Sequence, residues 1–277
     1  MTPEQLKDLL RRHGIRPNVT YGQNFLTDEV ILEDIIDIAE VTKEDTVFEI
    51  GPGIGNLTER LLNRANFVLS VEKDDKFFAI LKALKKEHKN FRFEFADALE
   101  FNFVKAMEEF GAGSHNYKVV ANIPYYITGK ILQMFLTAKY KPTSITILTQ
   151  KEVAKNVIAK PGQLSILGIS VQLYGEPSLA KIVLAKSFYP APKVDSAVLH
   201  IKLFSKPKYE ISDEKKFFGL LKACFAGKRK QIHNTLTSNM RIEKGRVEEI
   251  LDSLNISKIT RPQELTIQQW IELYKKV

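Results

Sequence analysis

Short apolar runs alternate with amphipathic segments over Thr46–Phe204. The runs Thr46–Ile50 and Phe67–Glu72 are rich in β-branched and aromatic residues, which is typical of buried strands. Asn56–Arg64 and Asp75–Lys86 repeat their apolar positions with helical spacing. Strands that alternate with helices predict βαβ units, in which a parallel sheet is covered by helices on both faces. Further strands are expected at Phe91–Ala96, Lys118–Ile123 and Ser144–Thr149, and further helices near Leu99–Phe110 and at Ile131–Ala138.

The later part of the chain loses this alternation. Leu179–Leu184 and Ala197–Phe204 have strand patterns, but only a proline-bearing stretch separates them, so we expect an antiparallel hairpin at one sheet edge. Ile166–Tyr174 is expected to be helical or buried. After the second of these strands only helical patterns follow, which predicts an α/β domain over residues 1–205 and a small all-helical domain over 206–277. The helices are expected at Asp213–Phe225, Lys228–Leu236, Glu243–Leu254 and Glu264–Tyr274.

Composition places the chain among ordinary globular proteins. Hydrophobic residues make up 44% and charged residues 27% of the 277 positions, so a wholly disordered chain is excluded. No apolar run approaches the ~18 residues of a membrane span, and we expect no membrane association. The single cysteine, Cys224, forms no internal disulfide, which makes the cytoplasm the expected location. The histidines lack metal-ligand spacing, and no metal is expected.

The net charge of +8 is unevenly distributed. Residues 206–277 contain 15 basic and 9 acidic residues, a net charge of +6, whereas the remainder contains 26 and 24, a net of +2. A basic helical domain is typical of a protein that binds a polyanion. Charge alone leaves open a second interpretation, in which these residues form only a solvated basic surface.

A glycine-rich turn follows the first predicted strand. Gly51, Gly53 and Gly55 stand directly after Thr46–Ile50 and before a helix, where a doubly wound sheet binds a nucleotide-like ligand. The spacing does not match a dinucleotide fingerprint, because Asn56 occupies the third glycine position, and the lysine of a phosphate loop is missing. A turn without a phosphate cradle suits S-adenosylmethionine; the alternative is a tight strand–helix turn without a ligand.

Two acidic residues end the next two strands. Glu72 ends the second strand, where a carboxylate can accept hydrogen bonds from both ribose hydroxyls of a bound nucleoside. Asp97 follows the third strand and can contact an adenine amino group, directly or through its neighbouring backbone. Asp97 can also act as the N-cap of the following helix. Since the carboxyl ends of parallel strands meet at one edge of a sheet, both residues are expected beside the glycine turn.

The fourth strand ends in Asn122-Ile-Pro-Tyr125, a tetrad suited to methylation of an adenine amine. The lone pair of that amine is delocalised into the ring, so an enzyme activates it by accepting its hydrogen bonds. The Asn122 side-chain oxygen is one acceptor, and the carbonyl before Pro124 is a second, because proline has no N–H and breaks the ladder. Tyr125 can stack on the base. The alternative is a strand that ends in a proline turn with a buried tyrosine.

Four motifs in order resemble those of the ribosomal RNA adenine N6,N6-dimethyltransferases, the family that includes the bacterial small-subunit enzymes. The erythromycin-resistance methyltransferases are relatives. The resemblance extends from about Tyr21 to the end of the chain. It implies a Rossmann-like class I methyltransferase sheet, S-adenosyl-L-methionine as cofactor and 16S-type rRNA of the small ribosomal subunit as partner. The motifs are Tyr21-Gly-Gln-Asn-Phe-Leu26, Glu49-Ile-Gly-Pro-Gly-Ile-Gly55, Asn122-Ile-Pro-Tyr125 and Phe188-Tyr-Pro-Ala-Pro-Lys-Val-Asp-Ser196.

The resemblance also implies roles for individual residues. Asn122 is expected to face both the cofactor and the target base. Phe188 matches an aromatic residue that stacks on the target adenine opposite Tyr125, although its own context equally suits a core position. The implied cofactor contacts are Asn24, Leu26, Gly51, Gly53, Glu72, Asp97 and Asn122.

The helical domain separates members of the family. Residues 224–236 resemble a basic helix of the small-subunit enzymes, with Lys228 where arginine is usual and His233 in place of another arginine. These considerations predict dimethylation of adenine N6 in small-subunit rRNA by a monomer, on two adjacent adenosines if the family's pattern holds. The alternatives are a resistance-type enzyme that acts on large-subunit rRNA and a non-catalytic assembly or transcription factor. The expected phosphate contacts are Lys222, Lys228, Arg229 and Lys230.

Overall fold

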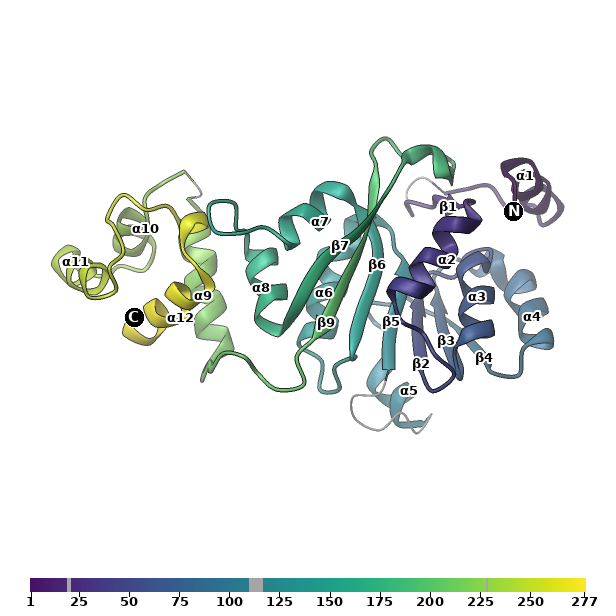
Figure 1. Ribbon diagram of the computed structural model, residues 1–277, viewed down its shortest axis with the longest axis horizontal. Coiled ribbons are helices and arrows are strands. Elements are labelled where there is room, and N and C mark those ends of the chain that lie inside the picture. Colours follow the sequence, from purple (N-terminus) through teal and green to yellow (C-terminus); the bar gives the residue numbers. More distant parts are fainter. Residues whose placement is uncertain (19–20, 110–116, 228) are drawn as a thin grey trace. The chain divides into compact units, whose positions relative to one another are not determined.

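Two compact units make up the chain. The computed structural model describes residues 1–18, 21–109, 117–227 and 229–277 (Figure 1). Unit 1 comprises Met1–Ala154 and Glu176–Leu203, and unit 2 comprises Lys155–Gly175 and Phe204–Val277. The division after residue 203 lies close to the expected boundary at 205. The packing differs from the expected division in one respect: residues 155–175 pack with the helical unit, because Leu164, Ile169 and Leu173 are buried in its core.

The centre of unit 1 is a seven-stranded sheet of order β4-β3-β2-β5-β6-β9-β7 (Figure 1). The five strands from β4 to β6 are parallel to one another, and β9 is antiparallel to β6. The order reverses between β2 and β5, and that switch point is where open α/β sheets bind ligands. This arrangement confirms the predicted Rossmann-like α/β fold. The strands are β2 (Thr46–Ile50), β3 (Phe67–Glu72), β4 (Phe91–Phe95), β5 (Tyr117–Asn122), β6 (Ser144–Gln150), β7 (Gly175–Val183) and β9 (Ser196–Leu203).

Helices cover both faces of this sheet because the side chains of each strand alternate between them. On one face, Val47 of β2 packs into a core with Leu61 of α3 and Ile35 of α2. On the other face, the neighbouring Phe48 contacts the rings of Phe103 in α5 and Phe135 in α6, at centroid distances of 5.8 Å for each. The helices of unit 1 are α1 (Pro3–Arg12), α2 (Glu29–Ile38), α3 (Asn56–Arg64), α4 (Phe78–Glu87), α5 (Phe103–Glu109) and α6 (Thr128–Leu136), and α7 (Lys151–Val157) crosses the boundary between the units.

Unit 2 consists of helices around a separate hydrophobic core. Trp270 is fully buried at its centre and stacks on Phe225 with 5.8 Å between ring centroids. Asp213 and Thr266 cap two of the helices through their side chains, which explains why those helices begin where they do. The predicted all-helical character is therefore present. The helices are α8 (Ile166–Tyr174), α9 (Glu214–Phe225), α10 (Ile232–Asn239), α11 (Lys244–Ser253) and α12 (Ile267–Lys276).

Several predicted bounds were wrong. The helix expected over Lys228–Leu236 begins only at Ile232, because the chain first turns back: the Lys230 N–H donates to the Gly227 carbonyl at 2.7 Å. Arg229 and Lys230 therefore lie in the turn between α9 and α10, and Lys228 lies outside the described residues. The helix expected over Leu99–Phe110 begins at Phe103, and Phe110 also lies outside the described residues. The two late strands are adjacent at the sheet edge, as expected, with β9 between β6 and β7.

Candidate active site

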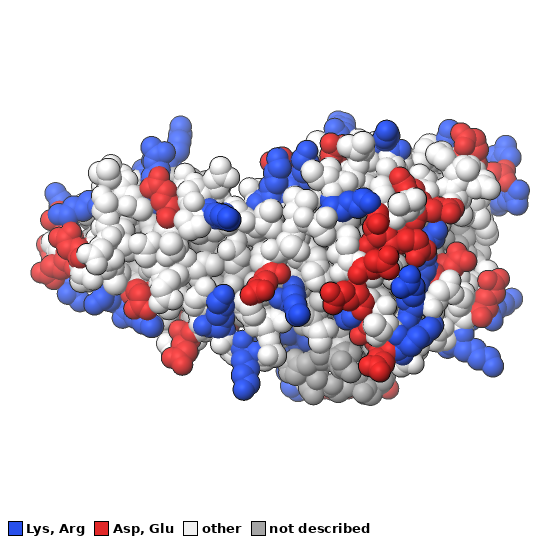
Figure 2. Space-filling model, in the orientation of Figure 1, with Lys and Arg blue, Asp and Glu red and all other residues white. Residues whose placement is uncertain are grey.

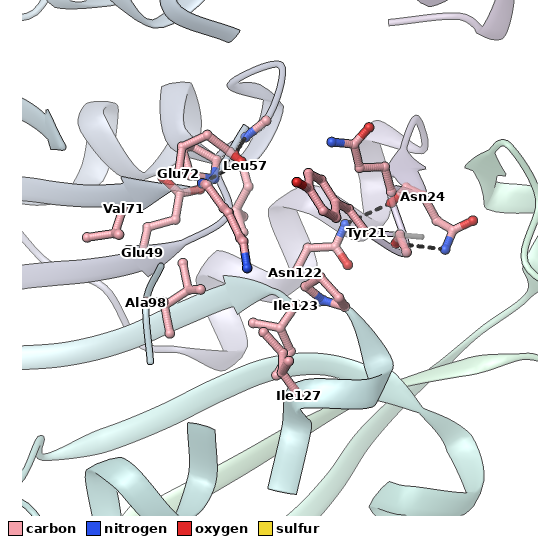
Figure 3. Close-up of a pocket in the computed structure, with 18 of the residues that line it drawn as sticks. Tyr21, Asn24, Glu49, Leu57, Val71, Glu72, Ala98, Asn122, Ile123 and Ile127 are labelled. Atoms are coloured by element: carbon pink, nitrogen blue, oxygen red, sulfur yellow. Dashed lines mark hydrogen bonds between the residues drawn. The ribbon is translucent and has the colours of Figure 1, made fainter. Parts of the chain in front are cut away.

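A pocket of about 310 Å³ opens at the carboxyl ends of β2, β3 and β5, the predicted ligand edge of the sheet (Figure 3). The glycine turn after β2, Glu72 at the end of β3 and Asn122 at the end of β5 all line it. The structure thus brings together three of the sequence motifs. The expected cofactor contacts that line this pocket are Asn24, Leu26, Gly51, Gly53, Glu72, Asp97 and Asn122.

The glycine turn has a backbone that favours glycine at all three positions. Gly51, Gly53 and Gly55 have φ angles of 69°, 53° and 81°, in the left-handed region. The Gly51 N–H donates to the Val71 carbonyl at 2.9 Å, which ties the turn to β3. A Cβ on Gly53 would lie 3.2 Å from the ring of Phe25. Gly51 and Gly53 thus line the pocket with main chain and no side chain, so a ligand can contact the backbone of the turn directly.

The carboxylate of Glu72 holds the turn and the end of β3 together. It accepts hydrogen bonds from the backbone N–H groups of Gly53 at 2.9 Å, Lys73 at 2.8 Å and Asp74 at 2.9 Å. The side chain is buried, and this burial raises the pKa of Glu72 despite the three donors. Because a carboxylate has about four acceptor positions, the three N–H bonds leave about one for a ligand hydroxyl.

Asp97 is engaged on both of its oxygens. One oxygen accepts from the Leu99 N–H at 2.9 Å, and the other lies 2.8 Å from the ammonium of Lys73. The hydrogen bond from Lys73 and then the Leu99 N–H hold the pKa of Asp97 below its usual range. Asp97 thus lines the pocket, but it is not the helix N-cap that the sequence suggested: its bond to the Leu99 N–H closes a turn, and α5 begins only at Phe103. Lys73 was missed in the sequence, because its partner is 24 positions away.

The side-chain amide of Asn122 has a defined orientation. Its Nδ2 donates to the backbone carbonyl of Asn24 at 3.1 Å, so its Oδ1 is the end of the amide left to accept a hydrogen bond. Asn24 donates in turn from its own side chain to the Gly22 carbonyl at 3.1 Å. The segment around Asn24, which is 98 positions away in the sequence, is thereby hydrogen-bonded to the predicted tetrad (Figure 3).

Tyr125 is linked to a second motif. Its hydroxyl lies 2.7 Å from the hydroxyl of Ser196, a fully buried residue at the start of β9. Burial raises the pKa of Tyr125, so the phenol is neutral at physiological pH. Pro124, which precedes it and also lines the pocket, would lie 3.3 Å from a Cβ on Gly22. The entry motif and the tetrad are thus in close contact.

Phe188 occupies a different environment from the one expected of a base-stacking residue. It lies in the short strand β8 (Phe188–Tyr189), which pairs with β1 (Phe25–Leu26), and its side chain is only 4% exposed. The ring belongs to the core of unit 1, and the residue is not among those that line the pocket. The core interpretation therefore describes this structure, because an apolar ring on a strand paired with Leu26 packs inward. Stacking on a base would require the ring to leave this packing.

The sequence reasoning overlooked Glu49 as a functional candidate. This carboxyl lines the pocket, is 1% exposed and accepts hydrogen bonds from Thr58 at 2.8 Å and Ser70 at 2.6 Å. Burial raises the pKa of Glu49 to about 7. The signal was an acid inside an otherwise apolar strand, which is expected to be buried only with polar partners.

Comparison with known proteins identifies the family. The model of the ribosomal RNA adenine dimethylase family matches residues 14–275. The chain belongs to this family. It is 39% identical, over 97% of its length and 91% of the relative's, to ribosomal RNA small subunit methyltransferase A of Dehalococcoides mccartyi. As a family member it is an rRNA adenine dimethyltransferase that uses S-adenosyl-L-methionine as methyl donor, and the predicted activity and cofactor are confirmed at this level.

Two solved structures extend the comparison. The chain is similar to the 23S rRNA methyltransferase ErmE, with a TM-score of 0.73 and 28% identity over 91% of this chain and 99% of that one. It also resembles a dimethyladenosine transferase from Plasmodium falciparum, with a TM-score of 0.76 and 24% identity over 90% and 95% of the two chains. The second likeness concerns the fold alone. Both agree with the class I methyltransferase fold expected of this family.

The pocket fits the family's methyl donor. S-adenosyl-L-methionine has a ribose, for which Glu72 retains an acceptor position, and no phosphate, in agreement with a turn that lacks a phosphate-binding lysine. The pocket lining also contains apolar side chains such as Ile50 and Val71, which suit the uncharged parts of a nucleoside. The described residues contain no cluster that would hold a metal ion.

The charged surfaces of the two units differ in character. On the face drawn in Figure 2, acidic side chains gather over α2, where Glu33, Asp34 and Asp37 stand. In unit 2, the predicted RNA contacts Lys222, Arg229 and Lys230 are all exposed.

No helix in the described parts of the chain is long and apolar enough to cross a membrane.

Proposed function

We propose that this chain dimethylates the N6 amines of two adjacent adenosines in small-subunit rRNA. The support is its 39% identity to small subunit methyltransferases from Dehalococcoides mccartyi and Clostridium botulinum, against 28% to the 23S rRNA methyltransferase ErmE. The enzyme acts as a cytoplasmic monomer on the small ribosomal subunit. Its role in ribosome biogenesis follows from that substrate.

The orientation of the Asn122 amide carries the mechanistic part of this proposal. Its Nδ2 donates to the Asn24 carbonyl, so its Oδ1 accepts a hydrogen bond from one N–H of the adenine N6 amine. The carbonyl of Ile123, ahead of Pro124, accepts a hydrogen bond from the second N–H. Tyr125 stacks on the base and holds the amine in line with the methyl group. Such alignment is worth up to about 7–11 kcal/mol of the barrier, since it replaces a bimolecular encounter.

The remaining pocket residues hold the methyl donor, which supplies an electrophilic sulfonium methyl when bound. The carboxylate of Glu72 accepts a ribose hydroxyl, and Asp97 with its neighbouring backbone contacts the adenine moiety. The bare main chain at Gly51 and Gly53 lies against the methionine moiety, flanked by Asn24 and Leu26. The same Glu72 carboxylate binds the Gly53 N–H, so the ribose contact and the shape of the glycine turn depend on one side chain.

Unit 2 supplies contacts to the RNA backbone. Lys222, Arg229 and Lys230 are exposed there, and Lys228 stands beside them in the sequence. Contacts of lysine and arginine to phosphates strengthen binding without reading sequence. Specificity then comes from RNA shape and from an adenine that leaves its stack.

A methylation assay tests the proposal against its nearest alternative, the large-subunit activity that the likeness to ErmE suggests. Labelled S-adenosyl-L-methionine is supplied with unmethylated small subunits and, separately, with large-subunit RNA. We expect label on the small-subunit adenosines only. Label confined to large-subunit RNA would overturn the substrate assignment.

A matched variant tests the catalytic assignment. Asn122→Ala should reduce transfer by at least roughly 100-fold, as expected when an acceptor that acts on the reacting amine is removed. Asn56→Ala is the control, because this second amide also lines the pocket but donates to the Leu26 carbonyl at 3.1 Å. Near-normal turnover in Asn122→Ala would remove Asn122 from the chemistry.

A further inference from the structure

Tyr126 is a large aromatic residue at the pocket that the mechanism does not use. It directly follows Tyr125 in the 3₁₀ turn Tyr125–Ile127 and lines the same pocket, yet its side chain is 63% exposed. Tyr125, by contrast, is half-buried, with its hydroxyl on Ser196. The two consecutive rings therefore lie in different environments, Tyr125 held inside and Tyr126 on the rim.

One side of the Tyr126 ring lies near the main chain of Gly22. Gly22 has a φ of 63°, and a Cβ there would lie 3.3 Å from the Cβ of Pro124 and 3.8 Å from Cε1 of Tyr126. The ring of Tyr126 thus rests near the bare main chain of the entry motif, while most of its surface faces solvent. An aromatic ring held on one side and open on the other is a platform for a nucleobase, since every base has a π-face.

Positive charge stands beside this platform. Lys130 is exposed in α6, four positions after Tyr126, and lines the same pocket. Asp97 lines the pocket as well, and the charge of Lys130 is among the causes that lower its pKa. Lys73 also lies at the mouth, paired with Asp97, with its ammonium 5.8 Å from the centroid of the Tyr21 ring. The pairing neutralises Lys73, so Lys130 is the cation we assign to a phosphate.

We propose that Tyr126 and Lys130 form a subsite for the nucleotide next to the target adenosine. Its base stacks on the ring of Tyr126, and its phosphate binds the ammonium of Lys130. The inference rests on the proposed position of the target adenine at Asn122 and Tyr125. An adenine that has left its stack to reach Asn122 brings its neighbour to the rim, because successive nucleotides are covalently joined.

Steady-state kinetics on unmethylated small subunits test the subsite. Tyr126→Ala should raise KM for the subunit roughly 5- to 100-fold, the range for loss of one base–aromatic stack, with kcat and S-adenosyl-L-methionine affinity close to wild type. Tyr126→Phe should keep the wild-type KM, because it keeps the ring. Lys130→Ala should raise KM several-fold. The slope of log KM against log salt concentration should also become shallower, by about 0.7–0.9 for one lost phosphate contact.

Lys43→Ala is the matched control. Lys43 is an exposed lysine just before β2, at the opposite end of the sheet from the pocket, and its loss should change neither KM nor the salt slope. An unchanged KM in Tyr126→Ala, equal losses in the Ala and Phe variants, or a loss confined to kcat or to cofactor affinity would each overturn the subsite. These outcomes concern the subsite only. A failure of the proposed function would instead appear as near-normal turnover in Asn122→Ala.

Discussion

The hydroxyl of Tyr125 lies 2.7 Å from that of Ser196, 71 positions further along the chain. The pair joins the tetrad at the end of β5 to the last residue of the proline-bearing motif Phe188–Ser196. Ser196 is fully buried and fixed by β9, which pairs with β6 in the central sheet. The base-stacking tyrosine of the proposed mechanism is therefore positioned by a strand that carries no other assigned role.

Removal of this bond should slow methyl transfer without affecting the cofactor. Ser196→Ala leaves a half-buried phenol without its partner, a cost of about 1–3 kcal/mol that favours other orientations of the ring. We expect kcat to fall roughly tenfold, which corresponds to about 1.4 kcal/mol, with unchanged affinity for S-adenosyl-L-methionine by calorimetry. Tyr125→Phe removes the same bond, so the double variant should be no worse than either single variant. Additive losses would mean that the two hydroxyls act separately.

Glu72 should control cofactor affinity. Glu72→Ala removes both the proposed ribose acceptor and the three N–H bonds that shape the turn. Loss of hydrogen bonds to a charged group costs about 1.5–3 kcal/mol, so Kd for S-adenosyl-L-methionine should rise roughly tenfold or more. Glu94→Ala, at a half-exposed acid of the neighbouring strand, is the control for isothermal titration. Wild-type affinity in Glu72→Ala would exclude this residue from the cofactor site.

How far the sequence predicted this site depended on the type of structural relationship. Glu72 and Asn122 were located correctly, since both end parallel strands and such ends meet at one edge of the sheet. Side-chain pairs such as Lys73 with Asp97, and Tyr125 with Ser196, were not predicted, because they depend on loop paths and on where β9 enters the sheet. Phe188 illustrates the same difficulty, since the pairing of β8 with β1 determines which way its ring points.

The errors in the fold have similar causes. Residues 155–175 joined unit 2 because Leu164 and Ile169 fit its core, and an apolar pattern does not say which core will bury it. The helix expected from Lys228 began at Ile232 because the main chain of Gly227 and Lys230 closes a turn. Helical propensity over a few charged residues is too weak to resist such a local bond.

Glu49 should make the stability of the protein depend on pH. Its pKa is raised by burial to about 7 in the folded protein, against 4.5 for an ordinary glutamate, so the folded state holds a proton more tightly than the unfolded state does. The free energy of unfolding should therefore fall as the pH rises from about 4.5 to about 7, by up to about 3 kcal/mol from this group. Glu49→Gln keeps an oxygen for Thr58 and Ser70 but does not titrate.

Denaturant unfolding at pH 5 and pH 8 checks this expectation. The variant should lose less stability than wild type between the two pH values, and the difference should be confined to that interval. Glu44→Gln, at an exposed acid ahead of the same strand, is the control. Parallel pH profiles for wild type and Glu49→Gln would mean that Glu49 is ionised throughout and that its environment stabilises the charge.

Neutralising the basic turn of unit 2 should weaken RNA binding and leave the cofactor site intact. The residues that line the pocket all belong to unit 1, so replacement of Lys228, Arg229 and Lys230 by Ala should not change the affinity for S-adenosyl-L-methionine. If each contacts a phosphate, the slope of log K against log salt should flatten by about 0.7–0.9 per lost contact.

Filter binding to small subunits at several salt concentrations measures both affinity and slope. The control is the triple replacement of Lys215, Lys216 and Lys244 by Ala, which removes the same charge from exposed positions elsewhere in unit 2. If the control variant loses as much affinity as the turn variant, the helical unit attracts RNA through its total charge. A slope that flattens only in the turn variant locates the phosphate contacts between α9 and α10, in a turn whose geometry is set by Gly227 and by the late start of α10.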